Sequence, residues 1–301
     1  MGVDTYVDAL QKKYKDSFII FGSSPKLNIE RISTGSLTLD ATLGGGLPKG
    51  KMVVFWGQEM SGKTTTALLC LKGVEKGLYV DVEKSYDPEW AKKLGLDIDN
   101  LIVARPSSGE VALSIVADAL QKEFDVVVID SVAALVPSLE LNKGLEESMV
   151  VAAQARLINY GIRRLNLMNK NTCLIFVNQV REKIGVMYGS PEKMPGGRAI
   201  YFVPHVRLKF RKGGWLPRDK KEAKRMGIEV RVMVEKNKFG ESQRDVHFDL
   251  YWAGYIDVVE EKARLMLDSG EVTQSGMWYT YKNKRYRGKE ELLEVIKKNV
   301  E

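Results

Sequence analysis

MVVFWGQEMSGKT, residues 52–64, joins an apolar strand to a glycine-rich loop, and the helix-forming residues TTALLCLKG follow it. The loop at Gly57–Thr64 fits the pattern GxxxxGK[ST]. Its glycines let consecutive backbone N–H groups approach phosphate oxygens, and the start of the next helix adds partial positive charge. A glycine turn before an ordinary helix is the alternative interpretation, but the strand and helix on either side favour a phosphate-binding loop.

Apolar runs and helical stretches alternate along the rest of the chain. The runs GLYVDVE, NLIVARP, DVVVIDS and TCLIFVNQ are separated by expected helices after Lys63 and over Pro88–Leu94, Glu110–Lys122 and Glu146–Met168. Strands that are apolar on both faces and joined through helices predict an α/β fold with a mostly parallel twisted sheet covered on both faces. After about Tyr201, the alternating runs HVRLKFRK, EVRVMVEKNK and DVHFDLYW predict antiparallel additions to the same sheet.

The pattern divides the chain into three expected parts. Residues 1–29 hold an amphipathic helix and then a short strand, SFIIF, at Ser17–Phe21. Residues 30–255 form the nucleotide-binding core. Residues 256–301 form a small, shortened α+β lobe with the helix VVEEKARLML, a two-strand signal in WYTYKNKRYR and the closing helix KEELLEVIKKNVE.

The composition excludes several classes of protein. With 301 residues, 44% hydrophobic and 28% charged, the chain is expected to be globular rather than disordered or collagen-like. It has no apolar run long enough to span a membrane and only two cysteines, so we expect a cytoplasmic protein without a disulfide framework. The 46 basic and 39 acidic residues give a net charge of +7, which suits a polyanionic partner. His205 and His247 are too scattered for a zinc site.

Four side chains carry the chemistry of nucleoside triphosphate hydrolysis. Lys63 is expected to reach the β- and γ-phosphates and Thr64 to ligate Mg²⁺. Asp130 ends the buried run DVVVID, as a Walker B acid that supports the metal does. Glu83 follows another strand and is a candidate for polarising the attacking water, with a helix-capping or solvated acid as the alternative.

Longer segments resemble a known family. The stretches IERISTGSLTLDATLGGGLPKGKMV, GLYVDVEKSYDPEWAKKLGLDIDNL, IDSVAALVPSLEL and NQVREKIGVMYGSPEKMPGGRAIYF closely resemble the RecA family of bacterial recombinases, over about residues 30–257. The resemblance implies a RecA-like core and a DNA-dependent ATPase that uses ATP and Mg²⁺. It further implies a helical filament on single-stranded DNA, with ATP between subunits, that pairs and exchanges strands with homologous duplex DNA in recombination and repair.

The resemblance also implies roles for single residues. Gln179 falls where the family senses the γ-phosphate and orders the following DNA-binding loop. Asp87 and Trp90 fall where it holds and stacks the adenine. Lys236 and Lys238 fall where it reaches the neighbouring subunit's ATP; two surface lysines on an alternating strand are the alternative. The expected catalytic residues are Glu83, Lys63, Gln179, Lys236 and Lys238. The expected nucleotide-binding residues are Gly57, Gln58, Glu59, Met60, Ser61, Gly62, Lys63, Thr64, Thr65, Asp87, Trp90, Asp130, Ser131 and Tyr251, and Thr64 and Asp130 also hold the metal.

Two loops are expected to bind DNA. The first, residues 142–149, is acidic and weakly informative; the second, Glu182–Arg198, combines glycines with basic and apolar residues, which suits sequence-independent binding. A substrate-binding loop without nucleic acid is the alternative. The expected DNA-binding residues are Arg181, Lys183, Ile184, Met187, Lys193, Gly196, Gly197 and Arg198.

The sequence departs from the family's pattern in places. Leu157 and Gly161 stand where the family places a serine and an arginine against DNA, and Arg156, Arg163 or Arg164 are candidate substitutes. Trp252 replaces a glycine near the adenine. The chain ends without the family's acidic tail, which suits a compact member of viral or divergent origin.

Two other functions stay open on the sequence alone, namely a hexameric DNA helicase-type motor on the same core and an accessory module that binds ATP and DNA without hydrolysis. A helicase motor needs no loop such as IGVMYGSPEKMPGG, and an inactive module needs no Glu83. The first 29 residues resemble the family's polymerisation arm, which docks on the next subunit, whereas packing on the chain's own core is the alternative.

Overall fold

The computed structural model describes residues 3–15, 19–141, 153–182, 192–216 and 225–298. Contacts divide the chain into two compact units, Met1–Glu30 and Arg31–Glu301. No helix within these described ranges is long and apolar enough to cross a membrane.

The first unit contains helix α1 (Val3–Lys13) and a short 3-10 turn η1 (Pro25–Leu27). No residue of α1 is buried, and its apolar residues Val3 and Tyr6 are exposed. The predicted strand at Ser17–Phe21 is wrong for its described part, because Ile19–Phe21 has no strand conformation; Ser17 and Phe18 lie outside the described residues. A strand needs a partner for its backbone N–H and C=O groups, and here Ile19 C=O instead accepts from Gln11 Nε2 at 2.6 Å.

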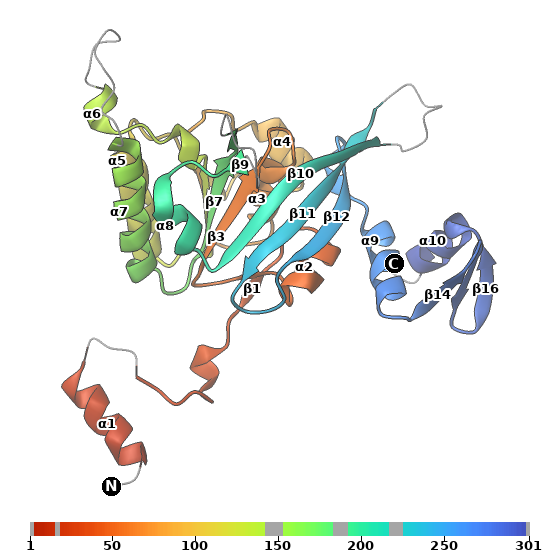
Figure 1. Ribbon diagram of the computed structural model, residues 1–301, viewed down its shortest axis with the longest axis horizontal. Coiled ribbons are helices and arrows are strands. Elements are labelled where there is room, and N and C mark those ends of the chain that lie inside the picture. The colour runs from red at the N-terminus through yellow and green to blue at the C-terminus, as the bar shows by residue number, and fades with distance from the viewer. Residues whose placement is uncertain (1–2, 16–18, 142–152, 183–191, 217–224, 299–301) are drawn as a thin grey trace. The chain divides into compact units, whose positions relative to one another are not determined.

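A nine-stranded sheet organises the second unit, in the order β13-β12-β11-β10-β3-β7-β6-β4-β5 (Figure 1). The parallel part consists of β10 (Val206–Leu216), β3 (Met52–Gly57), β7 (Cys173–Gln179), β6 (Val126–Asp130), β4 (Gly77–Asp81) and β5 (Ile102–Ala104). The antiparallel part adds β11 (Gly227–Asn237), β12 (Arg244–Tyr251) and β13 (Tyr255–Ile256). This confirms the predicted mostly parallel sheet and its antiparallel additions.

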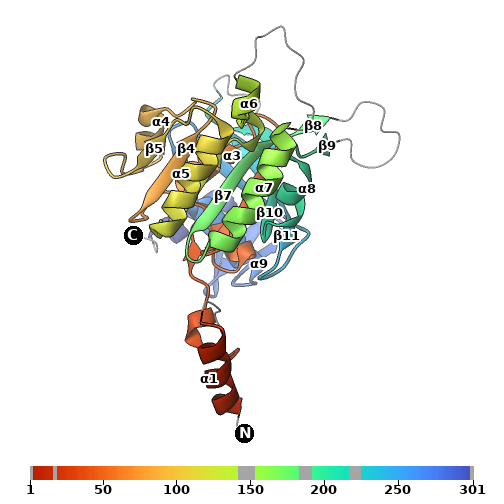
Figure 2. The same ribbon diagram turned by 90° about the vertical axis from the view of Figure 1, so that its left-hand side faces the viewer.

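Helices cover both faces of the sheet, as predicted (Figures 1 and 2). Strand residues alternate between the two apolar clusters, and β3 sends Val53 and Phe55 to one and Val54 and Trp56 to the other. The first cluster is covered by α2 (Leu37–Leu43), α3 (Lys63–Leu69) and α4 (Pro88–Lys93). The second is covered by α5 (Gly109–Gln121), α7 (Ala153–Met168) and α8 (Gly197–Phe202).

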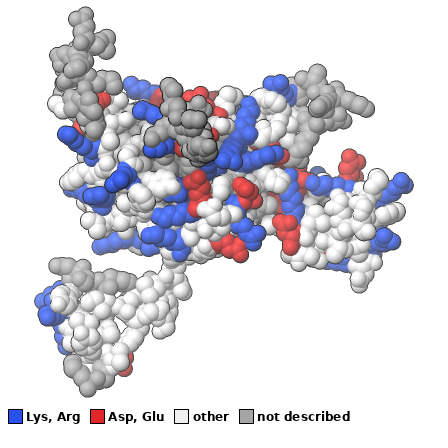
Figure 3. All heavy atoms as spheres, in the orientation of Figure 1, with Lys and Arg blue, Asp and Glu red and all other residues white. Residues whose placement is uncertain are grey.

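Short elements complete the core. They are β1 (Arg31–Ile32) paired with β2 (Leu47–Pro48), the 3-10 turn η2 (Val132–Ala134), α6 (Ser138–Leu141), and β8 (Arg181–Glu182) paired with β9 (Glu192–Lys193). One face of the core carries a band of lysine and arginine side chains around β10 and β11 (Figure 3). Arg211 and Arg231 are exposed and stand opposite each other in that pair of strands.

The C-terminal residues form an apolar cluster of their own. It is built from α9 (Val258–Asp268), β14 (Val272–Ser275), β15 (Trp278–Tyr281), β16 (Lys284–Arg287) and α10 (Lys289–Lys298). The β15–β16 hairpin confirms the predicted two-strand signal, and β14 is a third strand that the sequence reading omitted. The domain boundary at residue 255 stays a prediction.

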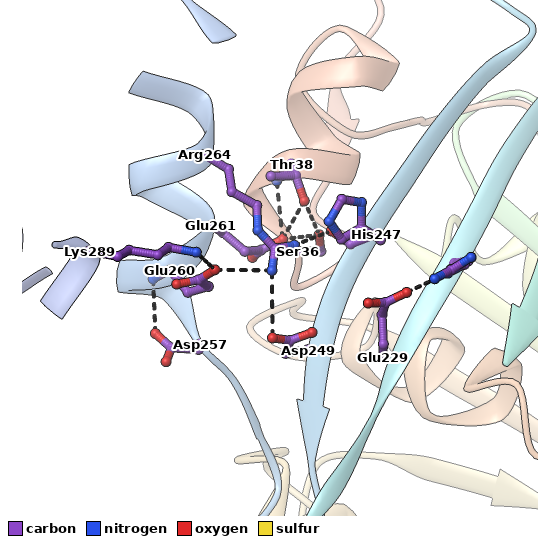
Figure 4. Close-up of polar contacts among 11 residues, drawn as sticks. Ser36, Thr38, Glu229, His247, Asp249, Asp257, Glu260, Glu261, Arg264 and Lys289 are labelled. Atoms are coloured by element: carbon purple, nitrogen blue, oxygen red, sulfur yellow. Dashed lines mark hydrogen bonds and ion pairs between the residues drawn. The ribbon is translucent and has the colours of Figure 1, made fainter. Parts of the chain in front are cut away.

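Polar contacts join α9 to the core (Figure 4). The buried Glu261 carboxylate accepts hydrogen bonds from the Ser36 and Thr38 hydroxyls and from the backbone N–H groups of Leu37 and Thr38, at 2.9 and 3.3 Å. It therefore holds the first turn of α2. Arg264 donates to the His247 carbonyl at 2.9 Å and lies 3.1 Å from Glu260.

Candidate nucleotide site

Two glycines shape the loop between β3 and α3. Gly57 has φ 146° and Gly62 has φ 88°, both in the region that favours glycine. A Cβ on Gly57 would lie 2.0 Å from the Phe210 carbonyl oxygen, and one on Gly62 would lie 2.8 Å from a Val230 methyl. The loop can therefore form only where these positions lack side chains, and it lies against the strands of the sheet.

Lys63 is the first residue of α3 and is buried, with 7% of its surface exposed. Its ammonium donates to the Gln58 carbonyl at 2.5 Å and lies 3.5 Å from the Ser61 hydroxyl. Burial lowers the pKa of Lys63, although the Asp130 and Glu83 carboxylates act against this. The cation is thus held over the loop, where phosphate oxygens can replace the loop carbonyl as its partner.

Thr64 and Asp130 meet beside that cation. The Thr64 hydroxyl donates to Asp130 Oδ2 at 2.6 Å, and the Tyr79 hydroxyl donates to the same oxygen at 2.9 Å. Burial raises the pKa of the Asp130 carboxyl, while the two hydroxyl donors oppose the shift. A hydroxyl and a carboxylate so close together are the hard oxygen ligands that Mg²⁺ prefers, so these residues fit the metal.

Glu83 lies against the ends of two neighbouring strands. It accepts hydrogen bonds from the Ser131 hydroxyl and, at 3.0 Å, from Gln179 Nε2. The backbone N–H groups of Val82 and Glu83 donate to the Asp130 carbonyl at 2.8 and 3.2 Å. Glu83 and Gln179 also line a cavity of about 300 Å³, together with Arg181 and Pro195. The structure therefore brings Glu83, Asp130, Ser131 and Gln179 together, as parallel strands do at their carboxyl ends.

Two residues that the sequence reading missed, Tyr79 and Asp81, position this group. Tyr79 orients Asp130 as described, and the fully buried Asp81 fixes the segment that follows β4. Asp81 accepts from the N–H groups of Ser85 and Tyr86 at 2.9 and 3.2 Å and from Arg105 Nε at 3.0 Å. The available signal was a tyrosine and an aspartate alternating within the otherwise apolar run GLYVD.

The residues expected around the adenine come from two segments that touch. Asp87 caps α4 by accepting from the Glu89 N–H at 2.9 Å, and Trp90 packs half-buried on the first apolar cluster. The turn after β12 lies on the end of α4, because a Cβ on Gly254 would be 2.3 Å from the Lys93 carbonyl oxygen. Tyr251 at the start of this turn stacks on Tyr255, with ring centroids 4.7 Å apart. Trp252 is exposed and meets the Trp215 ring edge-on at 6.1 Å.

Lys236 and Lys238 lie away from the phosphate loop of their own chain. In the sheet register, Lys236 stands opposite Arg207, and Arg207 stands opposite Val54. Val54 is three residues before Gly57, so Lys236 lies about 10 Å along the strand direction from the start of the phosphate loop. Its ammonium donates to the Phe202 and Pro204 carbonyls at 2.8 and 2.6 Å. Burial, followed by the charges of Lys238 and Arg207, lowers the pKa of Lys236.

The second predicted DNA-binding loop is shorter than expected. Arg181 and Lys193 stand opposite each other in the β8–β9 pair. Gly197 and Arg198 are corrected from loop to the first turn of α8, because Gly196 at φ 103° starts a helix whose Ala199 and Ile200 are buried in the second cluster. Lys183, Ile184 and Met187 and the first loop, 142–149, lie outside the described residues.

Packing explains part of the departure from the family's pattern on helix α7. A Cβ on Gly161 would lie 2.5 Å from Leu113 Cδ1, so this glycine permits the close approach of α7 and α5. Leu157 packs on the second apolar cluster. Arg156, Arg163 and Arg164 are exposed on the same helix.

Comparison with known proteins gives one consistent result. The family model described as the RecA N-terminal domain matches residues 2–257. Protein RecA of Thermus aquaticus is 40% identical over an alignment that covers 99% of this chain and 90% of that protein. Protein RecA of Caulobacter vibrioides, strain NA1000 / CB15N, is 42% identical, covering 95% and 82%, and that of Aquifex aeolicus is 40% identical, covering 97% and 86%.

Proposed function

This chain belongs to the RecA family, and we propose that it is an ATP- and Mg²⁺-dependent recombinase that forms a helical filament on single-stranded DNA and pairs it with a homologous duplex. The hydrogen bond from Gln179 to Glu83 carries the proposal. Through this bond, Glu83, which is proposed to orient the attacking water, contacts the end of β7. That strand leads into the second predicted DNA-binding loop.

Each residue at the loop has a distinct task in phosphoryl transfer. The N–H groups of Gly57–Thr64 and the Lys63 ammonium bind the phosphates, and Thr64 and Asp130 would hold the metal. Mg²⁺, when bound, offsets the negative charge of the transferring phosphoryl group. Glu83 orients the attacking water as a hydrogen-bond acceptor, and the Ser131 hydroxyl fixes the direction of its carboxylate.

Gln179 links the ATP site to the DNA-binding loop in this mechanism. Its amide donates to Glu83 in this structure, and a γ-phosphate oxygen beside it offers a second, more highly charged acceptor. A change of partner by the amide shifts the end of β7, and with it the following β8. Binding free energies of two linked ligands are reciprocal, so DNA must tighten ATP binding by the factor by which ATP tightens DNA binding.

The second subunit enters through Lys236 and Lys238. Because they lie about 10 Å along the sheet from their own phosphate loop, we propose that they act on the ATP of a neighbouring copy. Their clustered positive charges with Arg207 gain a favourable partner when a phosphate arrives there. The amphipathic α1, whose apolar residues are exposed, is proposed to dock on the adjacent subunit.

A DNA-stimulated ATPase assay tests the function. We expect hydrolysis to rise on adding single-stranded DNA, and electron microscopy with a non-hydrolysable analogue to show helical filaments. Hydrolysis that ignores DNA, in a chain that stays monomeric with every ligand, would contradict the proposal. Ring particles that unwind duplex DNA would instead favour a helicase-type motor.

A further inference from the structure

Glu192 touches both the phosphate loop and the sheet. It lies in β9, directly after residues 183–191. Its Oε1 accepts a hydrogen bond from Gln58 Nε2 at 3.3 Å, and its Oε2 forms an ion pair with Lys209. Gln58 is the second residue of the phosphate loop, so this carboxylate connects that loop with the strand on the far side of the predicted DNA-binding segment.

Lys209 anchors this contact. Its side chain is only 5% exposed, and a buried ammonium must be paired to be tolerated. Lys209 stands opposite Trp56 in the β10–β3 register, with its Nζ 4.7 Å from the indole ring centre. The ion pair lowers the pKa of Glu192, so the carboxylate stays charged at neutral pH. Glu192 is therefore held at a fixed place beside the residue that precedes Gly57.

Two connections reach the predicted DNA-binding segment from the nucleotide site. One runs from Glu83 through Gln179 into β8, and the other runs from Gln58 to Glu192 in β9. The strands β8 and β9 pair with each other, with Arg181 opposite Lys193. We propose that Glu192 is a positioning residue that transmits the conformation of the phosphate loop to β9, so that ATP acts on both strands that flank the DNA-binding segment. This inference rests on the proposed function.

The quantity to measure is the coupling factor, defined as the Kd for single-stranded DNA without nucleotide divided by the Kd with saturating non-hydrolysable ATP analogue. The variant Glu192→Ala/Lys209→Met removes the contact with Gln58 and leaves no unpaired buried charge. Its coupling factor should fall by roughly fivefold or more, within the usual range of such couplings. The variant Glu192→Gln/Lys209→Met has the same neutral background but keeps a carbonyl oxygen for Gln58, and it should retain most of the coupling.

The matched pair separates transmission from mere packing. If Glu192 had only a structural role, the two double variants would behave alike. Equal coupling factors in both variants would therefore overturn the inference. A wild-type coupling factor in Glu192→Ala/Lys209→Met would overturn it as well. Thermal unfolding shows whether each variant is folded. If neither double variant folds, the test is Gln58→Ala, which must lower the coupling factor at saturating nucleotide. An unchanged coupling factor in Gln58→Ala overturns the inference.

Two further measurements complete the design. Glu241→Gln makes the same chemical change at an exposed carboxylate paired with Arg244, and its coupling should equal that of the wild type. A wild-type coupling factor of one would contradict the proposed function itself. Normal wild-type coupling with an unaffected Glu192→Ala/Lys209→Met variant would overturn only the role of Glu192.

Discussion

Glu83 is the residue on which hydrolysis depends in the proposed mechanism. Replacing it in Glu83→Gln keeps the size of the side chain but removes the charge that orients water. We expect turnover to fall by about 10²- to 10⁴-fold, while ATP and DNA binding and filament formation persist. Steady-state hydrolysis and analogue binding measure the two effects. Glu89→Gln, an exposed change on α4, is the control, and normal hydrolysis in Glu83→Gln would place the catalytic role elsewhere.

Tyr79 acts through one hydroxyl. In Tyr79→Phe, Asp130 Oδ2 loses a donor at 2.9 Å in a buried setting, and its carboxylate is less well oriented for the metal. We expect the Mg²⁺ concentration for half-maximal ATPase to rise by about 10- to 100-fold. Tyr86→Phe is the control, because it makes the same change on a ring that contacts Tyr79, with centroids 5.6 Å apart. An unchanged Mg²⁺ dependence would show that Asp130 is oriented without Tyr79.

The sequence predicted those site residues that lie at the end of a single strand or in the loop directly after it. Lys63, Thr64 and Asp130 meet because parallel strands end at the same edge of the sheet. Asp81 and Tyr79 could not be assigned, since their roles depend on β6 being the neighbour of β4 and on Arg105 lying at the end of β5. Strand order arises from packing between distant segments, which local periodicity does not contain.

The same limit applies to whole elements. The parallel strands and the helices between them have strong periodicity, and the structure confirms them within the described residues; of the predicted helix Glu146–Met168, these show α7 (Ala153–Met168). The helix α8 was missed because it has only six residues and two glycines precede its apolar side chains. The strand at Ile19–Phe21 was overpredicted because an apolar run shows β-propensity whether or not a partner strand exists.

Helix α2 depends on a residue far away in the sequence. Glu261 is 1% exposed and accepts four hydrogen bonds from Ser36, Leu37 and Thr38. In Glu261→Gln, an amide NH₂ replaces one of the two carboxylate oxygens. This new donor then faces a hydrogen-bond donor of α2, where the carboxylate oxygen accepted a bond. The free energy of unfolding should fall by about 2–3 kcal/mol, measured by urea denaturation. Glu290→Gln, exposed on α10, should change it little; equal stability of the two variants would refute the capping role.

At the scale of the whole molecule, we expect charge to contribute strongly to DNA binding. The net charge is +7, and lysine and arginine side chains gather around β10 and β11 (Figure 3). DNA phosphates that pair with lysine and arginine side chains release counterions, so the logarithm of the DNA association constant should fall linearly with the logarithm of the salt concentration. The expected slope is about −0.7 per phosphate neutralised on a single strand. A titration of fluorescent oligonucleotide binding against salt measures it, and a flat response would exclude an electrostatic interface.

Acid should destabilise the folded chain through His205. Burial, followed by the charges of Lys238, Lys51 and Lys236, lowers the pKa of His205 to about 4, below its value of about 6.5 in the unfolded chain. The neutral ring is therefore favoured on folding. Its contribution to stability is complete above pH 6.5 and is lost as the pH falls toward 4, by about 1 kcal/mol at pH 5 after allowing for solvent screening.

The variant His205→Asn isolates this effect. Asparagine keeps an acceptor for the Met52 N–H, which now lies 3.4 Å from His205 Nδ1, but it does not titrate. Urea unfolding at pH 7, 6 and 5 should show a smaller loss of stability in His205→Asn than in the wild type. Equal losses of stability in the two proteins would contradict the role of His205.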